Sequence, residues 1–275
     1  MKRDINIMKL SILSQKAGLF KDLLDCIEKI TTEVQFTCDD DGLSLQCMDS
    51  SHAMLVDLNV PGSWFTAYNA PQSVTWGTSL KELCAVLGCR AKKQTIHIDV
   101  DPETDKIFVA FLDGDDTDIA KEFEINQYDF DSERLAVPDD EHDVDLSVDS
   151  VRFGKLLTEL ESFGGEVQIN CTDEAVRFKS REGPVSMSAT LPQSDMTDYA
   201  LPEEGVSEVF ASSYLLVAAS FAKLSKYATV PRTMDVHLNR SRPAHFRFVL
   251  GEGENPPVVE AIVAPRMGDD DSDCE

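Results

Sequence analysis

The sequence lacks the features of an exported or membrane-spanning protein. Its seven cysteines form no CxxC pair, and their odd number argues against a disulfide framework. No stretch approaches the roughly 20 apolar residues that cross a bilayer. Residues 1–13 have neither an adequate apolar core nor a small-residue cleavage site for a signal peptide. We therefore expect a reduced, intracellular protein that is neither exported nor inserted into a membrane.

Short catalytic and nucleotide-binding motifs are also missing. The chain has no GxxxxGK[ST] and no GxGxxG, which argues against a bound nucleotide, and it has no GxSxG and no HExxH. Ser51 and His52 are adjacent, so we expect them on opposite sides of a strand. They are therefore not expected to act as a nucleophile and its base.

Basic residues are scarce: 25 Lys and Arg stand against 50 Asp and Glu, which gives a formal net charge of -25. Such a protein is very soluble, and its average surface repels phosphate. The composition is otherwise globular, with 42% hydrophobic and 27% charged residues. At 275 residues the chain is long enough for two domains, each with its own core.

An internal repeat indicates what those two domains are. Residues 20–45 align without a gap to residues 153–178, at an offset of 133. Nine of the 26 aligned pairs are identical, among them Phe20/Phe153, Val34/Val167 and Cys38/Cys171, and most other apolar positions are matched in kind. Such a run predicts a tandem pair of related domains, and suggests a pseudo-symmetric scaffold rather than an active site.

Hydrophobic periodicity predicts four helices and many short strands. The helices are expected at 20–30, at 79–88 with Ser79 and Glu82 at capping-box spacing, at 153–163, and at 212–227. Alternating runs predict strands at 43–47, 54–60, 95–100, 167–171, 175–179, 234–238 and 245–250. We therefore expect an α+β fold in which two helices per half cover one face of antiparallel sheets.

The segment Tyr128–Asp145 is acidic and irregular with an apolar centre, and so reads as a linker. We expect an N-terminal domain at 1–127, a connector at 128–145, a C-terminal domain at 146–267 and an acidic, disordered tail at 268–275.

The residues from Leu43 to Leu58 carry a family resemblance. The strand LSLQC runs into Met48-Asp49-Ser50-Ser51-His52 and then into AMLVDL. The resulting pattern LxLQxMDSSHxxLVxL strongly resembles that of the eukaryotic and archaeal DNA sliding clamps. The resemblance also covers the first helix, Leu135–Pro138, the third helix with its IxC strand and the closing Ala264-Pro265-Arg266, so it extends from about Lys9 to Met267.

This resemblance implies a homotrimeric ring of six similar domains of the DNA-clamp fold, with helices lining the hole and antiparallel sheets outside. Such a processivity factor encircles duplex DNA in the nucleus and tethers DNA polymerases and repair proteins. A separate ATP-driven loader opens and closes it. The resemblance implies no enzyme activity, no catalytic residues, no cofactor and no metal.

A ring held by topology need not grip phosphate, so an acidic exterior is compatible with this function. We expect basic residues on the hole-facing sides of the helices. Any one of them can instead belong to an ordinary solvated helix face. Asp22, Glu28 and Thr158 stand where the family often has a basic residue, so non-specific DNA affinity should be weak and salt-sensitive. The DNA-facing candidates are Lys21, Lys81, Arg90, Lys155, Lys223 and Lys226.

The resemblance also implies an outer groove that binds short peptides of client proteins through apolar and aromatic anchors. Ile262 stands where a tyrosine is usual and Ala53 is smaller than the common valine, so the anchor preference is expected to differ. For Leu55 a plain core position is an equal alternative. The groove is expected to comprise Met48, His52, Leu55, Leu135, Val137, Pro138, Pro243, Ala264 and Pro265.

The trimer joint is expected to pair an edge strand near 121–125 with one near 185–191 of the next chain, because unpaired strand edges need a partner. The family's ubiquitin-accepting lysine aligns with Asp173, so signalling through that position is not expected.

Two other functions compete with a homotrimeric clamp. The acidic stretch 99–118 suggests a metal-dependent nuclease or phosphatase, since two-metal sites need several close carboxylates, although solvated hairpin loops are the better explanation of this stretch. The nearer alternative is a subunit of a heterotrimeric checkpoint clamp. The intact MDSSH segment and the closing Ala-Pro pair favour the replicative clamp.

Overall fold

The computed structural model describes residues 7–101, 104–115, 118–130, 134–137, 141–201 and 205–266. Its contacts divide the chain into two compact units. The first contains 1–49, 56–135 and 250–259, and the second contains 50–55, 136–249 and 260–275. The domain boundaries expected from the sequence stay a prediction. Pro138 of the expected groove and the acidic tail lie outside the described residues.

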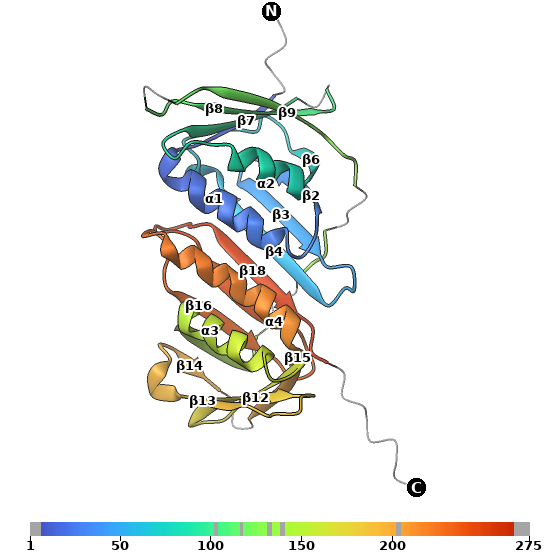
Figure 1. Cartoon of the computed structure of the whole chain (residues 1–275), viewed down its shortest axis with the longest axis vertical. Coiled ribbons are helices and arrows are strands. Elements are labelled where there is room, and N and C mark those ends of the chain that lie inside the picture. The colour runs from blue at the N-terminus through green and yellow to red at the C-terminus, as the bar shows by residue number, and fades with distance from the viewer. Residues whose placement is uncertain are drawn as a thin grey trace, which may run out of the picture. The chain divides into compact units, whose positions relative to one another are not determined.

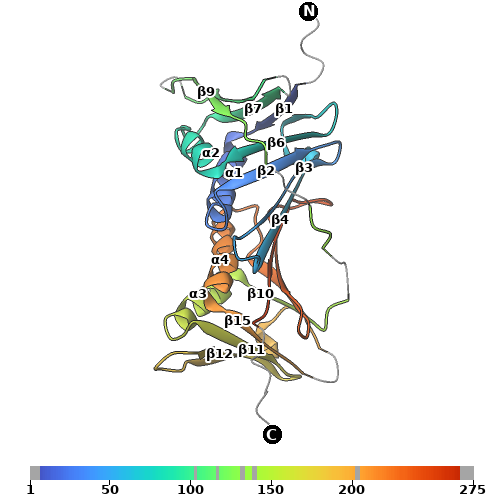
Figure 2. The ribbon, with the colours of Figure 1, turned by 90° about the vertical axis from the view of Figure 1, so that its right-hand side faces the viewer.

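The first unit contains two helices and two antiparallel sheets. Strand order is β5-β1-β7-β8-β9 in one sheet and β4-β3-β2-β6 in the other. Both helices lie on the same side of these strands (Figure 2). Its elements are β1 Met8–Ile12, α1 Ser14–Ile27, β2 Glu33–Cys38, β3 Gly42–Met48, β4 Met54–Pro61, β5 Ala67–Asn69, β6 Val74–Ser79, α2 Leu80–Gly88, β7 Thr95–Asp101, β8 Lys106–Leu112 and β9 Lys121–Asn126.

The second unit repeats this plan. Its strands follow the orders β14-β10-β16-β17-β18 and β13-β12-β11-β15, with both helices on one side (Figures 1 and 2). A 3-10 helix, η3, continues α4. The elements are β10 Val144–Asp149, α3 Ser150–Glu161, β11 Glu166–Cys171, β12 Ala175–Arg181, β13 Ser188–Pro192, β14 Tyr199–Ala200, β15 Val206–Ala211, α4 Ser212–Ala219, η3 Ser220–Lys226, β16 Thr233–Leu238, β17 Ala244–Val249 and β18 Val258–Val263.

The internal repeat is structural as well as sequential. Adding 133 to the bounds of β2 and β3 gives the bounds of β11 and β12. The matched pairs Val34/Val167 and Phe36/Ile169 are buried in both copies, as are Leu45 and Phe178. Equivalent positions therefore build equivalent cores, and both the tandem α+β organisation and the two helices per half are confirmed.

The helices follow the predicted apolar faces but not every predicted bound. α1 begins at Ser14, six residues before the expected start, and ends at Ile27, so Ile30 lies beyond it. In α2 the expected cap is present: the Ser79 hydroxyl accepts a hydrogen bond from the backbone N–H of Glu82 at 3.4 Å. The fourth predicted helix is α-helical only to Ala219 and then tightens into η3.

All seven predicted strands are present, and both predicted edge strands lie at the edges of their sheets: β9 ends one sheet and β13 ends another. The predicted linker 128–145 overlaps observed elements at both of its ends. Val144 and Asp145 begin β10, where apolar residues at alternate positions are buried. At the other end of the predicted linker, Tyr128 forms an isolated β-bridge with Gly77 of β6. The acidic composition concealed this short alternation.

The thiols of the described residues are free, and most are buried. Within the part of the chain that the structure describes, no helix is long and apolar enough to cross a membrane. Burial raises the pKa of the Cys38 thiol to about 11 and the pKa values of Cys47 and Cys171 to about 12. Cys89, just after α2, is exposed. These cysteines are therefore expected to differ sharply in reactivity.

We expect iodoacetamide at pH 8 to alkylate Cys89 well before Cys38 or Cys171. A pKa of about 11 instead of 9.0 lowers the thiolate fraction of Cys38 roughly 100-fold, and burial restricts access further. Peptide mass spectrometry of timed samples measures each rate, and the same reaction in urea is the control, where the rates should converge. Equal rates in the native protein would contradict the buried placement.

Candidate DNA-facing and partner-binding surfaces

Four of the six expected DNA-facing residues have exposed side chains on helices. Lys223 and Lys226 lie three residues apart in η3, and side chains at this spacing share one side of a 3-10 helix. Lys81 is exposed in the first turn of α2. Lys155 of α3 is 79% exposed, with Glu159 at 3.9 Å. An exposed pair at this distance contributes little, so Lys155 keeps its charge available to solvent.

The other two DNA-facing candidates are already engaged within the protein. Lys21 forms an ion pair with Asp25 one turn later in α1, and the hydrogen bond that Lys21 donates to Asp25 raises the pKa of Lys21 although partial burial lowers it. Arg90 lies beyond the end of α2, not on it. Its Nη1 donates to the carbonyl oxygens of Ala91, Lys92 and Gln94 at 2.8–2.9 Å. Arg90 therefore stabilises a turn. Its basic character alone did not predict this role.

The connector residue Leu135 is held by a side chain of the first unit. Gln46, on β3, donates through Nε2 to the Leu135 carbonyl at 3.1 Å and accepts through Oε1 from the Leu135 N–H at 2.7 Å. The neighbouring Arg134 donates to Ser44 and forms an ion pair with Asp57 at 3.2 Å. Backbone polar groups are thereby satisfied while the Leu135 side chain stays 47% exposed. The geometry presents an apolar side chain to solvent.

In the second unit, the MDSSH turn and the closing Ala-Pro pair meet. The Ala264 N–H donates to the Ala53 carbonyl at 2.9 Å. His52 is exposed with a φ of 59°, so it occupies a left-handed turn rather than the expected strand. The Ser51 hydroxyl lies within hydrogen-bonding distance of the Tyr214 hydroxyl on α4. The expected relation of Ser51 and His52 as strand neighbours was therefore wrong.

The remaining groove candidates are described within their own units. Met48, the last residue of β3, is half-buried. Leu55 and Val137 are also half-buried, and Pro243 is exposed between β16 and β17. That these residues converge into one groove stays a prediction.

The two sheet edges carry features that the sequence did not reveal. On β9, Phe123 is half-buried and its ring lies 5.5 Å from that of Phe111, while Glu122 and Glu124 are exposed. Beside β13 lies a pocket of about 270 Å³ lined by Phe153, Leu156 and Leu191, among others. One edge thus presents an aromatic side chain, and the other a pocket lined by apolar residues together with charged ones such as Arg152 and Glu159.

Three carboxylates of the 99–118 stretch have local partners. Asp99 lies 3.7 Å from Lys9, and Asp115 lies 2.7 Å from Lys93. Asp118 accepts from the backbone N–H of Asp115 at 2.9 Å. Among the described residues, the potential three-ligand metal groups lie elsewhere, so nothing in the described part of this stretch favours a two-metal enzyme. Asp173 is exposed in the turn between β11 and β12.

Two family models match the chain in succession: proliferating cell nuclear antigen, N-terminal domain, over residues 10–134, and proliferating cell nuclear antigen, C-terminal domain, over residues 136–255. Together they cover most of the chain. The chain belongs to the proliferating cell nuclear antigen family. It is thus a sliding clamp of DNA replication and repair, and the family is one of clamps rather than enzymes.

Three curated relatives agree with this assignment over nearly full length. Proliferating cell nuclear antigen 2 of Plasmodium falciparum is 26% identical, over 91% of this chain and 96% of that protein. The proliferating cell nuclear antigen of Chaetomium thermophilum is 25% identical, and that of Saccharomyces cerevisiae is 26% identical. Each of these two alignments covers 94% of this chain and 98% of the relative.

Proposed function

We propose that three copies of this chain close into a ring around duplex DNA, with β9 of each copy pairing with β13 of the next. The observation that carries the proposal is that both strands are sheet edges, one from each unit. Exposed edges are a liability unless another strand covers them. A head-to-tail contact that uses both edges generates a closed ring when the rotation per copy allows it.

The two edges are complementary in shape and charge. Phe123 lies on the same face of its sheet as Val109, which is buried, so it points toward the helix side. The pocket beside β13 opens between α3 and that strand, where an aromatic ring from a neighbouring copy can enter. On the opposite face, β9 carries exposed Glu122 and Glu124, and β12 next to β13 carries exposed Arg177 and Lys179. Opposite charges on the two sides favour this pairing and fix its register.

Light scattering on the purified protein at several concentrations tests the ring. A mass near three times the 30.5 kDa of the chain supports self-closure. A persistent monomer would contradict it and favour the alternative, a subunit of a heterotrimeric checkpoint clamp that needs other chains. The measurement is made at two salt concentrations, because the electrostatic attraction between oppositely charged, exposed faces weakens as salt concentration rises.

Within the ring we assign the hole to the helix sides of the units, with Lys81, Lys155, Lys223 and Lys226 toward DNA. The net charge of -25 keeps the rest of the surface from adhering to phosphate. We further propose a nuclear location and polymerases and repair proteins as clients, tethered through Leu135 in the first unit and the Ala53–Ala264 region in the second. The exposed Leu135 side chain supports the client site.

Replacing both Lys223 and Lys226 by alanine is expected to weaken DNA binding and to flatten its salt dependence. The slope of log K against log salt should decrease by about 1 for each lysine that contacts a phosphate. Fluorescence anisotropy with a labelled duplex at several salt concentrations measures it.

A matched control for this experiment replaces two lysines on strands, Lys9 on β1 and Lys106 on β8. The control should leave the slope unchanged. Equal losses of DNA affinity and salt slope in both double variants would mean that DNA binding depends on overall charge and not on the lysines of the helix sides.

A further inference from the structure

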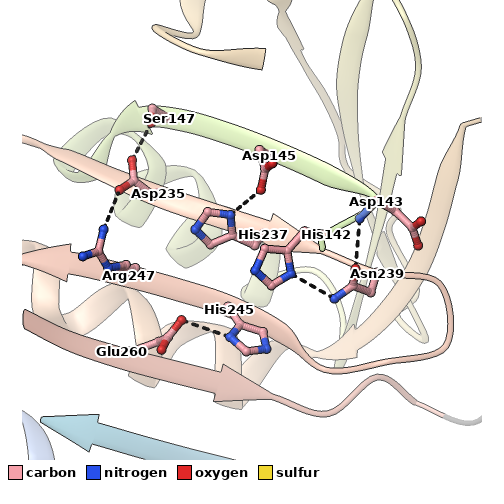
Figure 3. A network of polar contacts seen from close by, with 10 residues as sticks. All are labelled: His142, Asp143, Asp145, Ser147, Asp235, His237, Asn239, His245, Arg247 and Glu260. Atoms are coloured by element: carbon pink, nitrogen blue, oxygen red, sulfur yellow. Dashed lines mark hydrogen bonds and ion pairs between the residues drawn. The ribbon is translucent and has the colours of Figure 1, made fainter. Parts of the chain in front are cut away.

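Three of the five histidines of the chain gather on one face of the second unit, opposite its helices. In the antiparallel register Asp145 of β10 opposes His237 of β16, and His237 opposes His245 of β17. Residues directly opposite in such a ladder project from the same face. Figure 3 shows this row, with Glu260 of β18 beside His245 at 3.0 Å.

His142 joins the row from the segment that precedes β10. Its ring stacks on that of His237, with centroids 4.5 Å apart, and lies 5.2 Å from the ring of His245. Asn239 orients it: Oδ1 accepts from the Asp143 N–H at 2.9 Å, so Nδ2 donates to Nδ1 of His142 at 3.1 Å (Figure 3). Nδ1 of His142 thus accepts a hydrogen bond and the neutral ring carries its proton on Nε2, so metal coordination requires His142 to leave Asn239 or to change tautomer.

The side chains of His142, Asp145 and His237 lie close enough together to hold a metal ion. One donor atom from each lies within 4.8 Å of the other two. Nδ1 of His237 and Oδ1 of Asp145 are only 2.5 Å apart. Ligand atoms of a tetrahedral zinc ion lie roughly 3.3 Å from one another, given Zn–N distances near 2.0–2.1 Å. Because all three residues are partly exposed, their side chains can adjust by the remaining distance.

The chemistry of the donors selects the type of ion. Two imidazoles and one carboxylate suit Zn²⁺ and its first-row neighbours, whereas Mg²⁺ and Ca²⁺ prefer all-oxygen sites. The other three-residue group, Asp25, Glu28 and Cys84, is a poorer site because Lys21 already neutralises Asp25 and burial raises the pKa of Cys84.

We propose that His142, Asp145 and His237 form a binding site for a divalent first-row transition metal such as Zn²⁺. Binding replaces the hydrogen bond between His237 and Asp145, with the proton of the neutral His237 ring moving from Nδ1 to Nε2, and leaves the fourth position to water. The ion fastens the segment before β10 to β16, although residues 145 and 237 are 92 positions apart in sequence. The sequence patterns predicted no metal, since these ligands have no recognisable spacing.

Zinc titration of the full chain against a chromogenic chelator, at pH 7 with a non-thiol reductant, tests the site. The wild type should bind one zinc ion per chain. His142→Gln and Asp145→Asn should each lower the zinc affinity at least about 10-fold. His52→Ala is the matched control, because His52 is the exposed histidine of the same unit outside the cluster and should bind zinc as the wild type does. Circular dichroism verifies that each variant is folded.

A second readout separates this site from zinc held by thiols. Co²⁺ bound to nitrogen and oxygen donors gives weak visible bands, whereas thiolate ligands add intense charge-transfer absorption in the near ultraviolet. The proposal is supported by bands without thiolate absorption that disappear in His142→Gln. It is overturned if the wild type binds no zinc, if both cluster variants bind as tightly as wild type, if the control loses the same site, or if the Co²⁺ spectrum shows thiolate ligation.

Discussion

Phe123→Ala is expected to convert the proposed trimer into monomers at low micromolar concentration. The ring of Phe123 is half-buried on β9, and in the proposed joint it fills the pocket beside β13 in the next copy. An aromatic anchor of this kind typically contributes 2 kcal/mol or more to an interface. Since a closed ring contains three such joints, the loss recurs at each one. Light scattering should show the mass falling from three chains toward one.

Phe108→Ala is the matched control for this experiment. Phe108 is a phenylalanine on the adjacent strand β8 and is 39% exposed, but it projects from the face opposite to that of Val109 and Phe123. It should leave the mass unchanged. Since Phe123 sits at an edge and is only half-buried, its variant should stay folded as a monomer, which circular dichroism verifies. If the Phe123→Ala protein stays trimeric, β9 does not form the proposed joint.

The sequence predicted those parts of the fold that depend on local pattern. The repeat placed β11 and β12 in equivalence with β2 and β3, because a duplicated domain keeps its buried positions. Ser79 and Glu82 located the start of α2 through a contact within one turn. Both features require only residues that are close in sequence or matched in the second copy.

Contacts between distant residues were beyond this reasoning. Gln46 lies within the predicted strand 43–47, and nothing in its neighbours indicated that it holds Leu135, 89 residues away. The metal candidate likewise depends on strand register, which brings Asp145 opposite His237.

The predicted helix bounds were wrong for a related reason. Residues before Phe20 and after Ala219 have apolar content that suits several backbone states, and tertiary packing decides among them. α1 extends back to Ser14 because Ala17 and Leu19 are buried within the unit. The segment after Ala219 tightens into η3, which places Lys223 and Lys226 on one side.

Leu135→Asp is expected to abolish binding of client peptides, with at least a 30-fold loss corresponding to about 2 kcal/mol. Its side chain is 47% exposed while its backbone is held at both polar atoms by Gln46, so it is preorganised as an apolar contact. A charge there must be desolvated by any apolar anchor. Anisotropy with a labelled peptide containing one aliphatic and two aromatic anchors measures the loss.

Two further variants decide what Leu135 contributes. Gln46→Ala removes the two hydrogen bonds but leaves the leucine, so it should weaken binding less, through lost preorganisation of the connector. Leu112→Asp, at a leucine that is 37% exposed on β8, is the control and should bind peptide normally. If Leu135→Asp binds as the wild type does, clients use another surface. If Gln46→Ala leaves peptide affinity unchanged, the connector keeps its position without the two Gln46 hydrogen bonds. The exposed leucine itself then accounts for recognition.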